Sequence, residues 1–368
     1  MSSRRERERR RLSAALPLLA SFTLLLLALT VWVCARSWDA ASVLLRRWGN
    51  GVTAALGRLW SFLPLPLSEV LLILLPPAAV ALLIVRGVRG GWRRLRVTLC
   101  RMLCLGCALV FLFVSLYGVQ YSAPSLASRL GLTVRDASVD QLEQTTAALV
   151  AQLNELAPAV PRDGNGACRF GSFEEQAALV MTAWDSLTAR WPAFGVHRVA
   201  APRRSRLLGV AQSYLGNAGY FFPWTGESVV SSDSTPTQYA YDTAHESAHA
   251  RGVGPEAECN FLAYLVCLRS EDVRLRYSGV FNAYIYAGNA LYAADRTRWQ
   301  ALYATLCDEA KLDLRALNAQ VHKYDGPAKN LGDAVNDRFI KATGQPDGLR
   351  SYGLMVDLLI AWNEQEGT

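Results

Sequence analysis

The sequence predicts a mainly α-helical protein, with three N-terminal transmembrane helices followed by a larger domain of helices and one small β-sheet. Three observations predict this fold class. Apolar residues make up 51% of the 368-residue chain and are concentrated before position 123. The chain beyond it changes to amphipathic helical patterns, and one stretch, 199–230, has the composition of short strands. The predicted parts are a basic tail at 1–13, a membrane domain at 14–122 and an outer domain at 123–368.

The predicted transmembrane helices are three apolar segments at about 14–35, 63–85 and 97–121. The first has no charge, the second is interrupted only by Glu69 and by Pro76 and Pro77, and the third carries Arg101 near its start. Each is long enough, because a helix needs about 20 residues to cross the hydrocarbon core. A cleaved signal peptide is the alternative for the first segment. No small-residue cleavage site leading into a soluble domain follows it, which favours a retained helix.

Arginine clusters predict the orientation in the membrane. The tail at 1–13 and the loop at 86–96 are the most basic segments, so both are predicted to be cytoplasmic. The outer domain then lies outside the cell membrane. The net charge of +7 does not indicate nucleic acid. Residues 1–122 hold 16 arginines and 4 acidic residues, whereas the outer domain is net acidic. The predicted partner of the basic segments is the lipid bilayer.

The outer domain opens with helical patterns. A helix is predicted over 138–156, where Ser138 suits the cap, and another over 173–191, with a Pro- and Gly-containing loop at 158–166 between them. Aromatic and β-branched residues broken by Gly and Pro predict short strands within 199–230. Helical patterns resume after Thr243 and continue almost to the last residue.

The motif that indicates chemistry is His245-Glu246-Ser247-Ala248-His249, in a chain with only four histidines. Spacing of four residues puts both imidazoles on one face of a helix, where they can share a Zn²⁺ ion. Glu246 would then lie beside the water that the metal activates and take its proton as a general base. The alternative is a surface helix with two unrelated histidines. His197 and His322 lie outside any motif.

A catalytic zinc site normally has a third protein ligand. Gly252 and Gly254 are expected to end the motif helix and turn the chain, and Pro255 suits the first turn of the next one. Glu256 and Glu258 are the candidates, and they point about 200° apart on an ideal helix, so only one is expected to face the metal. Glu256 is preferred, with Asn260 on the same face to orient a ligand. Solvated glutamates at a helix N-terminus are the alternative.

Three stretches carry a resemblance to a known family: GYFFPWTGESVV, HESAHARGVGPEAECNFLAYL and VNDRFIKATGQPDGLRSYG. They resemble the bacterial membrane proteins called domain of unknown function 3810. The resemblance covers most of the chain and implies a zincin-like α+β outer domain with a gluzincin-like peptidase fold. Gluzincins have a glutamate ligand followed four residues later by aspartate. Asn260 stands at that position here, and the gap from His249 to Glu256 is shorter than in most gluzincins.

The resemblance also implies where a substrate binds. The segment 219–230 resembles the edge strand along which such enzymes bind an extended peptide, so that Thr225, Gly226 and Glu227 line the cleft. An ordinary buried hairpin is the alternative. Arg350, Ser351 and Tyr352 are candidates for stabilising the oxyanion, because metallopeptidases commonly use Tyr, His or Arg there, with Tyr352 as the first choice and Arg350 as a substrate-binding group.

The residues alone predict metal-assisted hydrolysis, and the resemblance implies a zinc peptidase that cleaves peptides or proteins outside the membrane. Two other classes stay open. One is a membrane sensor with a peptidase-like outer domain, although the cytoplasmic segments are short. The other is an envelope protein that binds zinc without turnover, although a structural zinc needs four ligands and no base.

Overall fold

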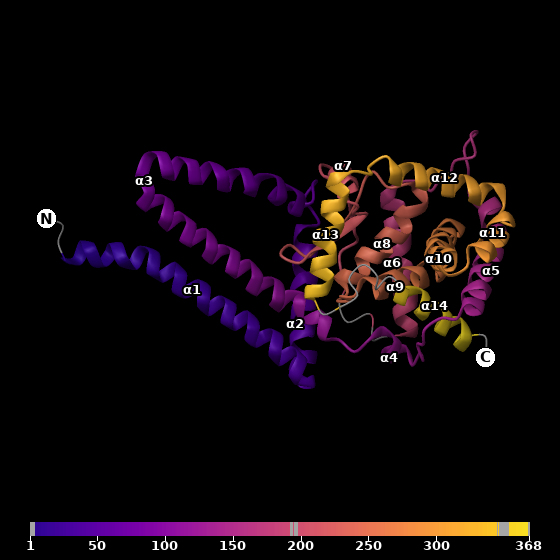
Figure 1. The fold of residues 1–368 in the computed structure, drawn as a ribbon, viewed down its shortest axis with the longest axis horizontal. Helices are drawn as coiled ribbons and strands as arrows, with labels where there is room; N and C mark the ends of the chain where they lie inside the picture. Colours follow the sequence, from indigo (N-terminus) through magenta and orange to yellow (C-terminus); the bar gives the residue numbers. More distant parts are fainter. Residues whose placement is uncertain (1–3, 192–193, 195–197, 344, 346–352, 367–368) are drawn as a thin grey trace. The chain divides into compact units, whose positions relative to one another are not determined.

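The computed structural model describes residues 4–191, 194, 198–343, 345 and 353–366. Helices dominate it (Figure 1). The chain divides into two compact units. Unit 1 comprises Met1–Ala123 together with the short segment Pro223–Gly226, and unit 2 comprises Pro124–Phe222 and Glu227–Thr368.

Unit 1 is built from three α-helices, α1 (Arg4–Ser37), α2 (Asp39–Trp60) and α3 (Leu67–Leu116), and the 3₁₀ helix η1 (Gly118–Ser122). Helices α1 and α3 pack along one another, and α3 is folded into two arms (Figure 1). The N-terminal end of α1 and the bend of α3 lie at the same end of this unit.

The prediction of three separate transmembrane helices is wrong in number. Among the described residues, two helices are long and apolar enough to cross a membrane, Ala14–Ser37 within α1 and Leu67–Leu116. The predicted segments 63–85 and 97–121 both lie largely within α3, which consists of two helical arms joined at a kink inside the basic stretch between them. Only Gly91 inside α3 departs from helical dihedral angles, with φ 61° and ψ −174°. Glycine accepts this conformation because it has no Cβ.

The segment Pro223–Gly226 packs into unit 1. Trp224 Nε1 donates to the Leu109 carbonyl at 3.1 Å, and the Trp224 and Phe113 ring centroids are 5.9 Å apart. A Cβ on Gly226 would fall 1.9 Å from the carbonyl oxygen of Thr53 in α2, and the φ of Gly226 is 68°. Only glycine therefore allows this approach of two backbones.

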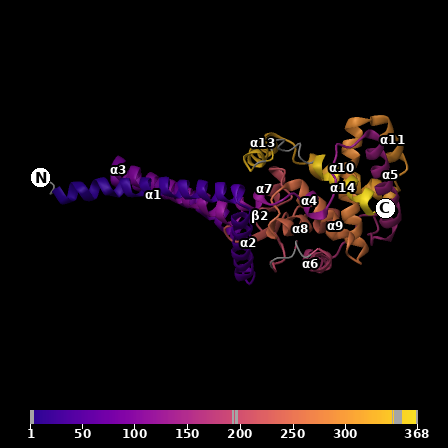
Figure 2. The same ribbon diagram turned by 90° about the horizontal axis from the view of Figure 1, so that it is seen from below.

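Unit 2 is a helical domain with one small sheet. Its predicted helices 138–156 and 173–191 correspond to α5 and α6, and Ser138 closes a capping box with Gln141. Helices α8, α9 and α10 pack against one another in the core, and α5 and α11 cover α10 (Figures 1 and 2). The helices are α4 (Leu126–Leu130), α5 (Val139–Leu156), η2 (Ala157–Ala159), α6 (Phe173–Arg190), α7 (Gly209–Tyr214), α8 (Pro236–Ala250), α9 (Glu256–Leu268), α10 (Val273–Ala294), α11 (Arg296–Ala304), α12 (Asp308–His322), α13 (Pro327–Ala342) and α14 (Gly353–Glu366).

The small sheet falls within the predicted region 199–230. It has three strands, β1 (Arg203–Arg204), β2 (Gly219–Phe222) and β3 (Glu227–Val230), in the order β1-β3-β2. The central strand β3 is parallel to β1 and antiparallel to β2, with Gly219 opposite Val230. Every residue of β3 is buried, whereas β2 is half-buried at one edge. The sheet packs against α8, the helix that carries the histidine motif.

Candidate metal site

Helix α8 carries His245 and His249 on one face, as their spacing of four residues requires. The helix starts at Pro236, whose missing N–H costs nothing in the first turn. It ends in a Schellman motif, in which Gly252 has φ 85° and Val253 N–H donates to the Ala248 carbonyl at 3.1 Å. This motif turns the chain back toward α8. Pro255 then occupies the N-cap of α9 rather than its first turn.

His245, His249 and Glu256 form one group in which a ligand atom from each lies within 4.8 Å of the others. The two imidazole Nε2 atoms are 3.1 Å apart. Glu256 Oε2 lies 3.3 Å from His245 Nε2, and Glu256 Oε1 lies 3.5 Å from His249 Nε2. His249 is buried, and the other two side chains are partly exposed. This group could hold a metal ion.

The other ring nitrogens indicate which atoms carry protons. His245 Nδ1 lies 2.8 Å from Asn260 Oδ1, and His249 Nδ1 lies 2.9 Å from the Val253 carbonyl oxygen. A carbonyl oxygen only accepts hydrogen bonds, so each Nδ1 is the donor and each Nε2 presents a lone pair. Two lone pairs and a carboxylate then converge with no proton between them, which is the arrangement that a divalent cation stabilises. The donor set therefore fits a metal ion.

Glu256 is held in its ionised form. Burial by itself would raise the pKa of Glu256, but in the metal-free chain the positive charge of protonated His249 and hydrogen bonds donated by His245 and His249 outweigh burial and keep this pKa well below its usual range; a bound cation would take the place of those protons. A carboxylate ligand has to be deprotonated to bind a metal, so this environment prepares Glu256 for that role.

Glu246 lies between the two histidines in the sequence, but its side chain is not part of the group formed by His245, His249 and Glu256. Its side chain is buried, and the Glu246 backbone carbonyl accepts a hydrogen bond from Ser228 Oγ at 2.9 Å. Within the described part of the chain, no hydrogen-bond partner reaches Glu246 Oε2. Burial raises the pKa of Glu246 to about 8; His249 lowers it, and Glu256 and Asp242 add to the increase. Without a metal, Glu246 therefore carries a proton at neutral pH, and a cation bound nearby would favour the ionised form that can accept one.

Glu258 and Glu256 point in different directions, as their places on α9 require. Glu258 Oε1 accepts the backbone N–H of Leu126 at 2.9 Å, so it anchors the start of α4. Burial raises the pKa of Glu258. Glu258 is not part of the metal-binding group, whereas Asn260 contacts it through His245.

The predicted substrate-binding residues lie in different surroundings. Thr225 and Gly226 belong to unit 1, where Thr225 is buried. Glu227 is buried in β3 and pairs with Arg203, with Nη1 and Oε1 3.1 Å apart. The segment 219–230 forms the hairpin strands β2 and β3, of which β2 is an edge strand. Arg350, Ser351, Tyr352 and His197 lie outside the described residues, and His322 is exposed beside Asp325.

Three contacts of the site were not predicted from the sequence. The Val253 carbonyl accepts from His249, and the Cys259 thiol donates to the same carbonyl with Sγ 3.4 Å from it and 3.3 Å from His249 Nδ1. Burial raises the pKa of Cys259 to about 12, so the group stays a thiol. Gly219 at the start of β2 is packed against the Glu246 side chain. The Gly252 turn was the one signal that could have indicated Val253.

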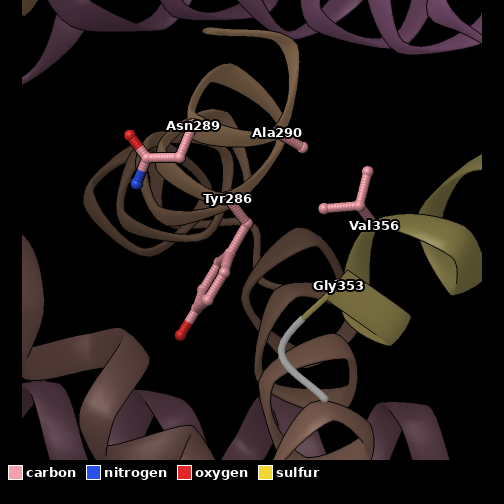
Figure 3. A pocket seen from close by; sticks show the side chains of 5 residues that line it. All are labelled: Tyr286, Asn289, Ala290, Gly353 and Val356. Carbon is pink, nitrogen blue, oxygen red and sulfur yellow. The ribbon is translucent and has the colours of Figure 1, made fainter. Parts of the chain in front are cut away.

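A pocket elsewhere in unit 2 lies between α10 and α14 (Figure 3). The described residues that line it are Tyr286, Asn289, Ala290, Gly353 and Val356. This lining contains no histidine and no carboxylate, so the pocket offers neither metal ligands nor a general base.

A model of the family described as "Protein of unknown function (DUF3810)" matches residues 47–360. The matched region starts inside α2 and includes α3, the sheet and the whole metal-binding group. No curated protein and no solved structure matches the chain.

Proposed function

The chain belongs to the DUF3810 family, whose function is unknown, and we propose that it is a membrane-anchored zinc peptidase acting outside the cytoplasmic membrane. One observation carries the proposal. The Nε2 lone pairs of His245 and His249 converge with the ionised carboxylate of Glu256, and the buried carboxylate of Glu246 stands on the intervening turn of α8.

Zinc is the metal that this donor set favours. Two imidazoles and one carboxylate match the three-ligand sites of zinc hydrolases, which keep a fourth position for water or substrate. A closed structural site would require a fourth protein ligand. The group found among the described residues has three members, so it fits a catalytic site better than a structural one.

Each residue then has a defined task. When bound, zinc supplies Lewis acidity, which activates water and polarises the scissile carbonyl. Glu246 would accept the proton of the attacking water and pass it to the leaving amine. Asn260 and the Val253 carbonyl hold the two imidazoles in the tautomer that directs Nε2 to the metal. Tyr352, with Arg350 as the alternative, remains our candidate for stabilising the oxyanion, on the basis of the family resemblance.

For the membrane arrangement, we propose that α1 and the two arms of α3 make three crossings. Apolar side chains are exposed along α1 and α3, as lipid contact requires. The basic stretch 86–96 lies at the bend of α3, at the same end of unit 1 as the N-terminal end of α1 (Figure 1). Both basic segments would therefore be cytoplasmic, and unit 2 would be outside.

The proposal is tested on the full chain, purified in detergent micelles, by zinc content and by cleavage of a peptide library followed by mass spectrometry. We expect about one zinc per chain, absent in His249→Ala and Glu256→Ala. Glu258→Gln, which removes a buried carboxylate outside the group, is the matched control and should retain zinc. Glu246→Gln should retain zinc and lose cleavage.

The outcomes separate the alternatives. A parent chain that takes up no zinc rules out the zinc peptidase. A parent that binds zinc but cleaves no peptide or protein is a zinc-binding membrane protein without turnover. Equal cleavage by the parent and Glu246→Gln removes the general-base role of Glu246.

A further inference from the structure

The helix α2 of unit 1 has its apolar and polar faces reversed relative to a helix of a water-soluble protein. Its buried face consists of small and polar residues, Ser42, Gly49, Asn50, Thr53, Ala54 and Gly57. They allow close backbone packing: a Cβ on Gly49 would fall 2.5 Å from the Leu116 carbonyl oxygen. The inward face therefore holds α2 against the rest of unit 1 by backbone proximity rather than by burial of large side chains.

Large apolar side chains point outward instead. Leu44 is 69% exposed, Trp48 51%, Leu59 53% and, in the turn directly after the helix, Phe62 74%. With about 100° of rotation per residue, and with the ideal helix continued to Phe62, the four fall within a sector of about 60°. They lie on one face as two pairs, and the small residues Gly51 and Ala55 occupy the middle of this stripe. An exposed apolar stripe of this kind marks a surface that meets another apolar phase.

Two exposed arginines lie beside the stripe on the helix surface. Arg47 and Arg58 lie about 40–60° to one side of Leu44 on the same ideal helix. Around its axis, α2 thus presents a packed small-residue face, an apolar stripe and a basic border. An apolar face with basic residues beside it, and tryptophan within it, is typical of helices that lie in the interface of an anionic bilayer.

We propose that α2 lies in the plane of the membrane and inserts the stripe Leu44, Trp48, Leu59 and Phe62 into the lipid interface, with Arg47 and Arg58 toward anionic headgroups. The occupant is lipid because α2 connects α1 directly to α3, whose exposed faces are also apolar. The helix does not cross the bilayer: α2 is not among the described helices apolar enough to span, and Arg46 and Arg47 stand in its middle. This inference is independent of the peptidase proposal.

The test uses the full chain in lipid nanodiscs containing phosphatidylglycerol and brominated phosphatidylcholine. Bromine quenches tryptophan on contact, and the emission of Trp48 is obtained by subtracting the signal of Trp48→Phe from that of the parent. Lipids brominated near the headgroup end of the acyl chain should remove roughly half or more of the Trp48 emission, and lipids brominated near the bilayer centre clearly less. Trp299→Phe reports in the same way on a half-buried tryptophan of unit 2, and its difference signal should not be quenched.

A second reporter covers the case in which Trp48→Phe perturbs the helix. Phe62→Trp places the fluorophore at the other end of the stripe, and the emission it adds to the parent should show the same depth preference. Two results would overturn the proposal. If neither the Trp48 signal nor the emission added by Phe62→Trp is quenched, protein or water, not lipid, covers the stripe. Stronger quenching from the bilayer centre would mean that α2 crosses the membrane.

Discussion

Gly219 lies directly against the side chain of Glu246. A Cβ placed on Gly219 would fall 2.7 Å from Glu246 Oε1 and 2.9 Å from Glu246 Cγ. It would also fall 2.8 Å from the backbone carbonyl oxygen of Val229, which the sheet holds in place. The start of β2 therefore leaves room for no side chain, and it limits the positions open to the Glu246 carboxylate.

We predict that Gly219→Ala lowers kcat about 100-fold without changing zinc content. The added methyl group clashes with both the Val229 carbonyl oxygen and the Glu246 side chain, so the start of β2 and Glu246 both have to shift, and a shift of about 1 Å in a catalytic group costs this much. Turnover of a cleaved library peptide and bound zinc are measured on the same preparations. Gly164→Ala is the control, because no atom lies within 4 Å of a Cβ there. An unchanged kcat in Gly219→Ala would show that this contact does not position Glu246.

Asn260 contacts His245 of the candidate metal site but is not itself a member of that group, so under the zinc proposal its removal should weaken zinc binding rather than abolish it. We predict that Asn260→Ala lowers zinc affinity about 10–100-fold, the usual effect of deleting a group that orients a ligand. Asn260→Asp keeps an oxygen that accepts from His245 Nδ1 and should restore most of the affinity. Competition against a chelating dye measures both. Equal affinities for the parent and Asn260→Ala would contradict the orienting role.

The spacing of residues in the sequence was sufficient to predict part of the candidate metal site. The four-residue interval places His245 and His249 on one helical face whatever the tertiary structure, and the two glycines after the motif signal a turn. The sequence showed that Glu256 and Glu258 point in different directions, but it could not show which of the two faces the histidines. The assignment depends on how α9 rotates against α8, and on the pairing of Glu258 with the Leu126 N–H, a contact across 132 residues of sequence.

For the candidate membrane helices, the sequence predicted the apolar segments but not the connection between them. Hydropathy located the apolar segments correctly, but it reports only the cost of placing side chains in lipid and not the backbone conformation between segments. The basic stretch 86–96 is helical on both sides of Gly91, so the two predicted segments form the two arms of α3, which meet at a kink there. The contact between Gly219 and Glu246 could not be predicted either, because it depends on the register between the β-hairpin and α8.

A buried polar network provides a test of stability away from the metal. Asp313 in α12 accepts both Arg162 Nη atoms at 2.8 and 3.1 Å and the Tyr277 hydroxyl at 2.6 Å. Asp313→Ala should lower the free energy of unfolding by about 3 kcal/mol, because the largely buried Arg162 loses its carboxylate partner and is left with the backbone carbonyls of Ala157 and Gly166. Urea unfolding of the full chain in micelles, followed by near-UV circular dichroism, measures this change.

The matched control is an exposed ion pair. Arg206 and Glu174 are 52% and 65% exposed, so Glu174→Ala should change the free energy of unfolding by less than about 0.5 kcal/mol. Similar changes in the two variants would mean that the Asp313 network does not stabilise unit 2.

The last prediction concerns Asp242, one helical turn before Glu246 on α8. Burial raises the pKa of Asp242 from its ordinary 3.8 to about 8, and the hydrogen bond from Ser234 offsets part of this. The folded chain therefore keeps this proton over a range of pH in which the unfolded chain has lost it. The contribution to stability is complete below about pH 4 and is lost as pH rises to about 8.

Asp242→Asn has no such loss. Between these pH limits, its free energy of unfolding should therefore rise relative to that of the parent by more than about 1.4 kcal/mol, which is the free energy equivalent of a shift of one pKa unit. Urea unfolding at several pH values, with a chelator present so that metal binding does not contribute, measures the difference, and the exposed Glu155→Gln serves as control. If the difference between Asp242→Asn and the parent is the same at every pH, Asp242 ionises alike in the folded and unfolded chains, and burial at this position does not retain its proton.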